Sequence, residues 1–130
     1  MPKLEERYNA WIDASFKAII QGDVDTQTSL WAENCTRTEI EAFGDHYTIQ
    51  GKDAIRKESE GLVTVFTNPK IVKNELLSAS QEKGIGNAVV RWTTKDGREA
   101  SCNFIYVITL DEEGHCVSYT EWNVVKAREA

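Results

Sequence analysis

The spacing of apolar positions changes from a helical period to a strand period near residue 35. From residue 4 to residue 20, apolar side chains recur every three or four positions, which predicts an amphipathic helix buried on one side. This helix is predicted to end at Gly22, and Asp23 then caps a second, shorter helix that runs to about Asn34. The buried stripe of the first helix comprises Leu4, Tyr8, Trp11, Ile12, Ser15, Phe16, Ile19 and Ile20.

Residues 36–41 alternate β-branched and charged side chains, which is the pattern of a strand with two unlike faces. A row of charges is normally the solvent face of a strand, but the same row becomes a candidate site if that face lines a pocket. The pattern alone leaves both interpretations open. The alternation places Thr36, Thr38 and Ile40 on one face and Arg37, Glu39 and Glu41 on the other.

The rest of the chain reads as a hairpin, a third helix and a series of strands. Gly44-Asp45 predicts a turn before a return strand at residues 46–49, and a third helix is predicted from Gly51 to near Gly61. Three helices followed by antiparallel strands predict a single α+β domain, residues 1–130, with the helices on one face of a curved sheet. The later strands are predicted at residues 70–80, 86–94, 98–110 and 116–125, with turns at residues 96–97 and 111–114.

Composition and charge limit the class of protein. The chain has 130 residues, a net charge of −6 and 41% hydrophobic residues, which fits one globular domain with one core. Its lysines and arginines are scattered, so neither nucleic acid nor an anionic membrane surface is an expected partner. No apolar run is long enough to cross a bilayer, and residues 1–7 lack the apolar core of a secretory signal. We therefore expect a cytoplasmic protein.

The motifs indicate neither a metal nor a cofactor. The three cysteines, Cys35, Cys102 and Cys116, lie far apart without a C-x-x-C pair, and His46 and His115 are the only histidines. The sequence also lacks a glycine-rich phosphate loop. We therefore expect chemistry that uses protein side chains alone.

Four segments carry a family resemblance: residues 22–23, 30–36, 51–55 and 114–117. With the order of elements, they resemble the nuclear-transport-factor-2-like superfamily, especially its SnoaL-like and ketosteroid-isomerase-like branches, over nearly the whole chain. The resemblance implies a cone-shaped, curved antiparallel sheet with three helices packed on its concave face and a largely apolar pocket between them. Many members of this superfamily are dimers through the outer face of the sheet.

The ketosteroid isomerase pattern implies roles for three residues. Glu39 falls on the position of the general base, and Tyr106 falls near one of the two oxyanion-hole donors. Ser15 stands where the other donor, a tyrosine, would be. Because serine replaces an acidic phenol, the resemblance does not imply steroid isomerisation itself.

The epoxide-hydrolase-like relatives draw attention to the last strand. Residues 120–123 resemble their closing motif, in which an acidic residue at the place of Glu121 works with a second carboxylate and an arginine. The arginine of those relatives lies on a different strand, so Arg37 is not matched by position, although Arg37 and Glu39 are the partners available in this chain. In an apolar cavity, two carboxylates and one guanidinium would supply one acid and one base.

Alternation along the strands suggests which other side chains share the pocket wall. Aromatic residues at such positions more often pack the core than hold a substrate. The expected substrate pocket comprises Ser15, Trp31, Arg37, Phe104, Tyr119 and Asn123, with Glu39, Tyr106 and Glu121 as the candidate catalytic residues.

Ile105, Val107 and Val117 lie on the opposite face of the same predicted strands. An apolar outer face must be covered, so a homodimer formed by two sheets packing back to back is expected.

The sequence therefore predicts a protein that binds a small apolar molecule in a central pocket. Its expected activity is that of a cofactor-independent isomerase, cyclase or hydrolase acting on a carbonyl or epoxide. The alternative is a non-catalytic ligand-binding module, or a dimeric protein-interaction module, on the same fold.

Overall fold

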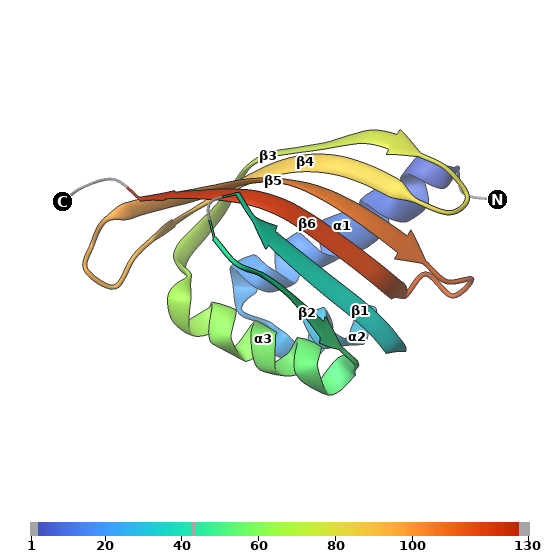
Figure 1. Ribbon diagram of the computed structural model, residues 1–130, viewed down its shortest axis with the longest axis horizontal. Helices are drawn as coiled ribbons and strands as arrows, with labels where there is room; N and C mark the ends of the chain where they lie inside the picture. The colour runs from blue at the N-terminus through green and yellow to red at the C-terminus, as the bar shows by residue number, and fades with distance from the viewer. Residues whose placement is uncertain (1–2, 43, 128–130) are drawn as a thin grey trace.

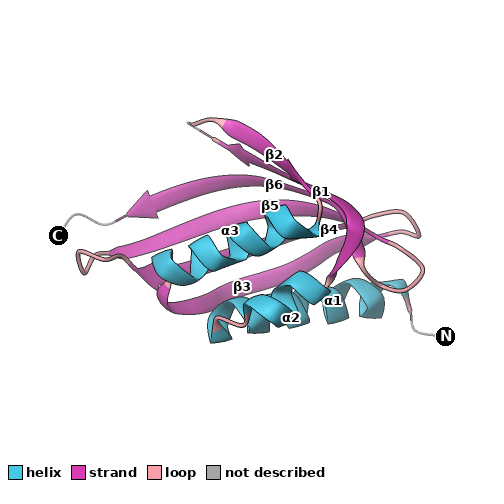
Figure 2. Cartoon of the chain, turned by 90° about the horizontal axis from the view of Figure 1, so that it is seen from below, coloured by secondary structure: helices cyan, strands magenta, loops and turns pink. Residues whose placement is uncertain are grey.

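Figure 1 shows three helices gathered on one side of a six-stranded sheet in the computed structural model, which describes residues 3–42 and 44–127. Figure 2 shows the same helices lying across the concave side of the strands. The strand order is β2-β1-β6-β5-β4-β3. The elements are α1 (Leu4–Gln21), α2 (Val24–Ser29), β1 (Trp31–Glu41), β2 (His46–Gln50), α3 (Lys52–Val65), β3 (Thr67–Ala79), β4 (Gly84–Thr93), β5 (Glu99–Leu110) and β6 (Cys116–Ala127).

The predicted α+β class is confirmed, and one strand pairing differs from the expected antiparallel pattern. β1 and β6 run parallel, whereas the other neighbouring strands are antiparallel. The meander from β3 to β6 reverses direction at each hairpin and returns β6 in the direction of β1. The sheet is therefore mixed, and the first and last strands lie side by side (Figure 1).

The first helix ends where the sequence predicts, and the second does not. Gly22 adopts the left-handed conformation, with φ 67°, that closes α1. The helix predicted to run to Asn34 is wrong, because α2 stops at Ser29 and β1 begins at Trp31. The carbonyl of Leu30 accepts hydrogen bonds from the Trp11 indole at 2.8 Å and from the backbone N–H of Cys116 at 2.9 Å. These tertiary bonds hold the backbone in an extended path at a point where local spacing favoured a helix.

The third helix is longer than predicted. Gly61 lies inside α3, which continues to Val65 and ends with the backbone N–H of Phe66 donating to the carbonyl of Leu62 at 2.8 Å. The apolar side chain of Leu62 lines the interior cavity, and this tertiary contact offsets the low helix propensity of the neighbouring glycine.

The core lies between α1 and the concave face of the sheet. Trp11 from α1 packs edge-on against Trp31 from β1, with ring centroids 5.6 Å apart. Trp31 also packs against Tyr119 from β6 at 5.9 Å. These rings pack the first helix against the first and last strands. The packing holds β1, which carries the charged residues, in place. Within the described part of the chain, no helix is long and apolar enough to cross a membrane.

Candidate active site

A cavity of about 340 Å³ lies between α1, α3 and the concave face of the sheet. Most of its surface is apolar, and a minority of its lining residues are polar or charged. A mostly apolar hollow with a few convergent polar groups is typical of a small-molecule site. The apolar lining includes Trp11, Ile12, Phe16, Ile19, Trp31, Ile55, Leu62, Val65, Phe66, Val90, Trp92, Phe104 and Val125.

The charged face of β1 lines this cavity. Arg37 and Glu39 have side chains that are only 13% and 17% exposed, so the solvent-face interpretation is wrong for both. Glu41, the last residue of β1, lines the same cavity but is exposed. The other face of the strand, with Thr38 and Ile40, points away from the cavity, as the alternation predicts.

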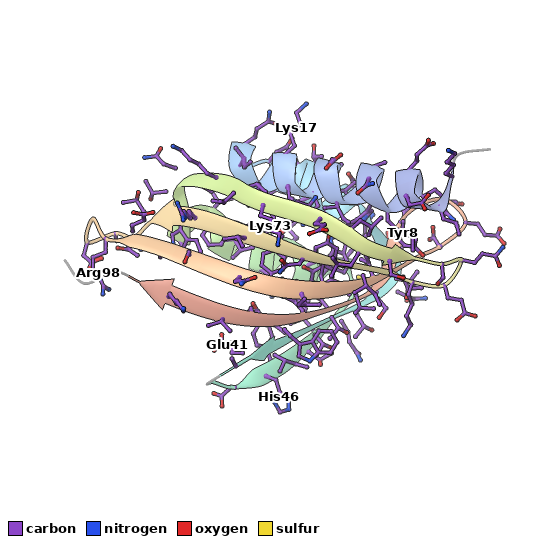
Figure 3. All side chains as sticks on the ribbon, turned by 90° about the horizontal axis from the view of Figure 1, so that it is seen from above. Tyr8, Lys17, Glu41, His46, Lys73 and Arg98 are labelled. Atoms are coloured by element: carbon purple, nitrogen blue, oxygen red, sulfur yellow. The ribbon has the colours of Figure 1, made fainter. Side chains whose placement is uncertain are left out.

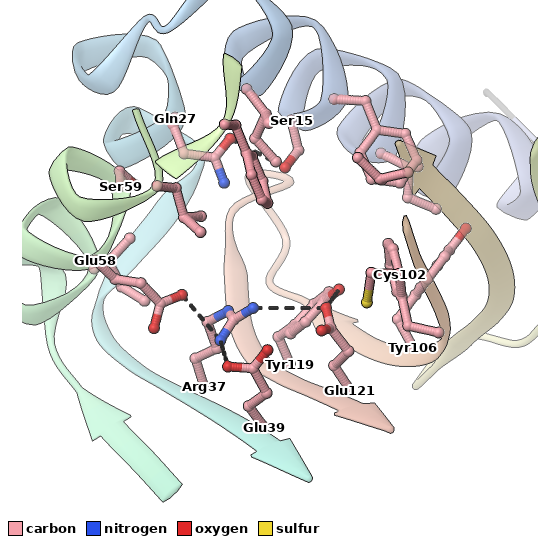
Figure 4. A pocket seen from close by; sticks show the side chains of 18 of the residues that line it. Ser15, Gln27, Arg37, Glu39, Glu58, Ser59, Cys102, Tyr106, Tyr119 and Glu121 are labelled. Carbon is pink, nitrogen blue, oxygen red and sulfur yellow. Dashed lines mark hydrogen bonds and ion pairs between the residues drawn. The ribbon is translucent and has the colours of Figure 1, made fainter. Parts of the chain in front are cut away.

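Arg37 is the centre of a charge cluster that we define as Arg37, Glu39, Glu58 and Glu121 (Figure 4). The shortest ion pair joins Arg37 Nη1 to Glu58 Oε1 of α3 at 2.9 Å. Arg37 Nη1 lies 3.5 Å from Glu39 Oε2, and Arg37 Nη2 lies 3.6 Å from Glu121 Oε1. The guanidinium also lies 5.3 Å from the centre of the Tyr119 ring. One cation therefore contacts three carboxyl groups on three different elements.

The parallel pairing of β1 with β6 brings the two candidate catalytic carboxyls together. Glu39 is the register partner of Glu121. The Asn123 amide nitrogen bridges them, donating to Glu39 Oε1 and to Glu121 Oε2 at 2.8 Å each. Glu121 also accepts a hydrogen bond from the Tyr119 hydroxyl at 2.8 Å, and Glu39 accepts one from the Tyr47 hydroxyl. Both carboxyls are thus fixed in place by donors from β2 and β6.

The surroundings shift the pKa values of these two carboxyls in opposite directions. Burial raises the pKa of Glu121 above its ordinary value, although Arg37 and the Asn123 amide oppose the shift. Burial acts the same way on Glu39, but the hydrogen bond from Tyr47 and the charge of Arg37 outweigh it and lower the pKa of Glu39. The site therefore holds an ionised carboxylate beside a carboxyl that retains its proton more readily.

Two further groups in the cluster are perturbed by the same burial. Burial raises the pKa of Glu58, and Arg37 opposes that shift. Burial works against the positive charge of Arg37, but Glu58 and Glu121 outweigh it and raise the pKa of the guanidinium, which stays charged.

The structure separates Tyr106 from this cluster. Its ring lines the cavity, but its hydroxyl donates to Asn74 Oδ1 on β3 at 2.8 Å. The ring lies directly over Gly86 of β4, where an added Cβ would fall 2.2 Å from the hydroxyl oxygen and the adjoining ring carbon. The phenol is therefore held with its proton directed at β3, away from Glu39 and Glu121 (Figure 4).

The remaining residues of the expected pocket, Ser15, Trp31 and Phe104, line the cavity, whereas His46 lies outside it. Ser15 lines the cavity from α1 and donates to Gln27 Oε1 at 3.0 Å. Trp31 and Phe104 form part of the apolar wall and are buried in the core cluster. His46 is exposed on the outside of the β1–β2 hairpin (Figure 3). Among residues 3–42 and 44–127, no group of three or more His, Cys, Asp or Glu side chains is arranged to hold a metal ion.

Glu58 and Tyr47 belong to the site and were missed in the sequence. Glu58 follows the buried Ile55 by three positions, so the apolar period of α3 carries a signal that this carboxylate faces inward. Tyr47 is the register partner of Glu39, a pairing set by the length of the β1–β2 hairpin. Gln27, on the short helix α2, offered no such signal.

Comparison with known proteins identifies the fold. No protein-family model matches the chain. No curated protein sequence matches it either. The chain is similar in structure to a Bacillus subtilis protein proposed to be an isomerase, with a TM-score of 0.80 and 16% identity over 94% of this chain and 89% of that one.

Two other solved structures show the same likeness. One is SalBIII, an epoxide hydrolase/cyclase-like enzyme with a role in pyran ring formation in the polyether salinomycin. It aligns with a TM-score of 0.72 and 22% identity over 92% of each chain. The BvnE pinacolase from Penicillium brevicompactum aligns with a TM-score of 0.71 and 14% identity over 93% of this chain and 88% of that chain. This chain therefore has the nuclear-transport-factor-2-like, SnoaL-like fold, as the sequence resemblance predicted.

Proposed function

We propose that the protein is a cofactor-independent acid–base catalyst, of isomerase or cyclase type, that acts on a small apolar molecule carrying a carbonyl or epoxide oxygen. One observation carries this proposal: Glu39 and Glu121 share one cavity wall, and their surroundings move their pKa values apart. Pairs of titratable groups perturbed in opposite directions are typical of sites that contain a general acid and a general base.

In the proposed reaction, Glu39 is the base and Glu121 the acid. Glu39 takes a proton from the substrate carbon or hydroxyl, and Glu121 gives its proton to the oxygen that gains negative charge. Arg37 contacts both carboxyls and stabilises whichever of them is ionised as the proton moves. The described neighbours include proteins named for isomerase, epoxide-cyclase and pinacolase chemistry, and these classes of reaction guide the choice of substrates to test.

The test is proton transfer in D₂O, followed by NMR, with a panel of apolar ketones and epoxy alcohols. The proposal expects enzyme-dependent deuterium uptake next to a ketone, or ring closure of an epoxy alcohol, with at least one member of the panel. Saturable binding of panel members without any turnover would contradict the proposal and favour the ligand-binding module.

The pH dependence of kcat/KM on such a substrate is expected to be bell-shaped. The acid limb reports protonation of Glu39 and should lie below the ordinary glutamate value of 4.5, because the pKa of Glu39 is lowered. The basic limb reports loss of the Glu121 proton and should lie above 4.5, because burial raises that pKa. Glu121→Gln should remove the basic limb, whereas Glu58→Gln should keep it. A basic limb that persists in Glu121→Gln would assign the acid to another group.

We also propose a homodimer through the outer face of the sheet. Ile105 of β5 and Trp122 of β6 are cross-strand partners on that face and are 39% and 44% exposed. Figure 3 views the molecule from this side. Equilibrium sedimentation at micromolar concentration should show a dimer, and Trp122→Lys should shift it to a monomer, because a charge would then be buried at the interface. A wild-type monomer at that concentration would contradict this proposal.

A further inference from the structure

The cavity has a second polar end, opposite the charge cluster. Ser15 of α1 and Gln27 of α2 line the cavity, and Figure 4 shows them across it from Arg37, Glu39 and Glu58. The rest of the cavity lining is mostly apolar and includes Phe16, Leu62 and Phe104, and Ser59 of α3 adds one hydroxyl. A ligand that fills the cavity must therefore match one polar group at each end and an apolar surface in between.

The orientation of the Gln27 amide makes this second end a hydrogen-bond donor. The Ser15 hydroxyl donates to Gln27 Oε1 at 3.0 Å, so the amide oxygen is occupied. Gln27 Nε2 donates to no group in the described part of the chain, and Figure 4 shows it turned toward the interior of the cavity. The amide thus presents N–H groups to the space that a ligand would fill.

The backbone holds Gln27 in this position. The Asp23 carboxylate caps α2 by accepting from the backbone N–H of Thr26 at 3.0 Å, and the backbone N–H of Gln27 donates to the Asp23 carbonyl at 3.0 Å. Ser15 itself is only 5% exposed. A donor fixed by its neighbours at an apolar wall is available to a ligand at little cost in side-chain entropy.

The chemistry of the two ends limits the ligand. The charge cluster has three carboxyls for one guanidinium, so it favours a ligand group that gives up or shares a proton and disfavours a carboxylate. The Gln27 end offers a neutral donor, which suits a carbonyl or ether oxygen and gives nothing to an ammonium group. An acceptor oxygen is also the partner that satisfies an otherwise unpaired N–H in an apolar surrounding.

We infer that Gln27 binds a second acceptor oxygen of the ligand, distinct from the oxygen that reacts at Glu121. The pocket then selects neutral hydroxy ketones and related molecules, with a hydroxyl or other reacting oxygen at the charge cluster and a non-reacting carbonyl or ether oxygen at Gln27. This inference rests on the proposed function for the role of the cluster end. Gln27 is then the residue that determines specificity, and Ser15 is the residue that positions the Gln27 amide.

Isothermal titration calorimetry with three matched compounds tests the inference. The compounds are para-hydroxybenzophenone, para-benzylphenol, which lacks the carbonyl, and benzophenone, which lacks the hydroxyl. The wild-type protein should bind the hydroxy ketone about tenfold more tightly than para-benzylphenol, the equivalent of one well-formed hydrogen bond. Gln27→Leu should reduce that preference to less than about threefold while leaving the affinity for para-benzylphenol nearly unchanged.

Two variants and a control keep the test decisive. Gln27→Glu keeps the shape of the side chain but replaces the donor with an acceptor, so it should also abolish the preference. Ser15→Ala leaves the amide free to turn and should reduce the preference partially, whereas the control Gln81→Leu, at an exposed position, should leave it intact. Equal preference in wild type and Gln27→Leu, or failure of wild type to bind the hydroxy ketone, would overturn the inference.

The same titrations separate this inference from the proposed function. If the preference follows Gln27 but no substrate is turned over in a manner that depends on Glu39, the acceptor site stands and the catalytic proposal fails. If turnover depends on Glu39 while Gln27→Leu keeps the wild-type preference, the catalytic proposal stands and the role of Gln27 fails.

Discussion

Glu39→Gln is expected to lower kcat on any substrate found in the deuterium or ring-closure assay by roughly 100- to 10,000-fold, the usual contribution of a positioned general base. Glutamine keeps the size of the side chain but cannot take up a proton. The melting temperature of the Glu39→Gln variant should stay close to that of the wild type, because two effects on stability offset each other. The variant loses a charge-assisted hydrogen bond from Tyr47, but it also removes one of three carboxylates around a single guanidinium.

The matched control is Glu33→Gln, on the same strand. The Glu33 side chain is 86% exposed and pairs only loosely with Lys52, at 3.9 Å, so its loss should leave both kcat and melting temperature unchanged. If Glu39→Gln keeps wild-type kcat while its stability falls sharply, Glu39 has a structural role and another residue is the base.

Arg37→Met is expected to destabilise the fold by about 3–5 kcal/mol at neutral pH, as is usual when one partner of a buried ion pair is removed. Methionine fills most of the space but leaves Glu39, Glu58 and Glu121 facing one another without a counter-ion. The free energy of unfolding from urea titrations measures this loss. By contrast, Arg56→Met breaks an exposed pair with Asp25 and should cost less than about 1 kcal/mol.

The destabilisation by Arg37→Met should depend on pH in a direction that identifies its cause. Without the guanidinium, the already raised pKa values of Glu58 and Glu121 rise further in the folded state, and the lowered pKa of Glu39 rises as well. The folded variant therefore binds more protons than the folded wild type. The stability deficit should therefore be smallest below pH 4.5, the ordinary glutamate value, and grow as the pH rises. Adding Glu58→Gln to Arg37→Met should recover part of the loss at neutral pH. A deficit that is independent of pH would show that lost packing, rather than unpaired charge, is responsible.

The sequence predicted the fold well because its strongest signals are local. The apolar period of α1, the glycine that ends it and the alternation in β1 each depend on residues close together in the chain. The end of α2 was mispredicted because it is set by hydrogen bonds to Leu30 from Trp11 and Cys116, which are distant in sequence. Periodicity in a short segment has no access to such contacts.

The charge cluster could be predicted only in part for the same reason. Alternation placed Arg37 and Glu39 on one face, but their contact with Glu121 depends on the parallel register between the first and last strands. Glu58 reaches the same point from α3, across the cavity. The direction of the Tyr106 hydroxyl also depends on a distant element, because Asn74 of β3 accepts its proton. Which side chains from different elements meet depends on the tertiary packing of those elements. That packing determines which residues form the site.

Carbon-13 NMR titration of labelled glutamate side chains measures whether Glu39 and Glu121 form a base and an acid in one cavity. Resonances are assigned by their absence in Glu39→Gln and Glu121→Gln, so no substrate is required. The Glu39 carboxyl should titrate below the ordinary value of 4.5 and the Glu121 carboxyl above it. Titration of both carboxyls at the ordinary value, or in the reverse order, would contradict it.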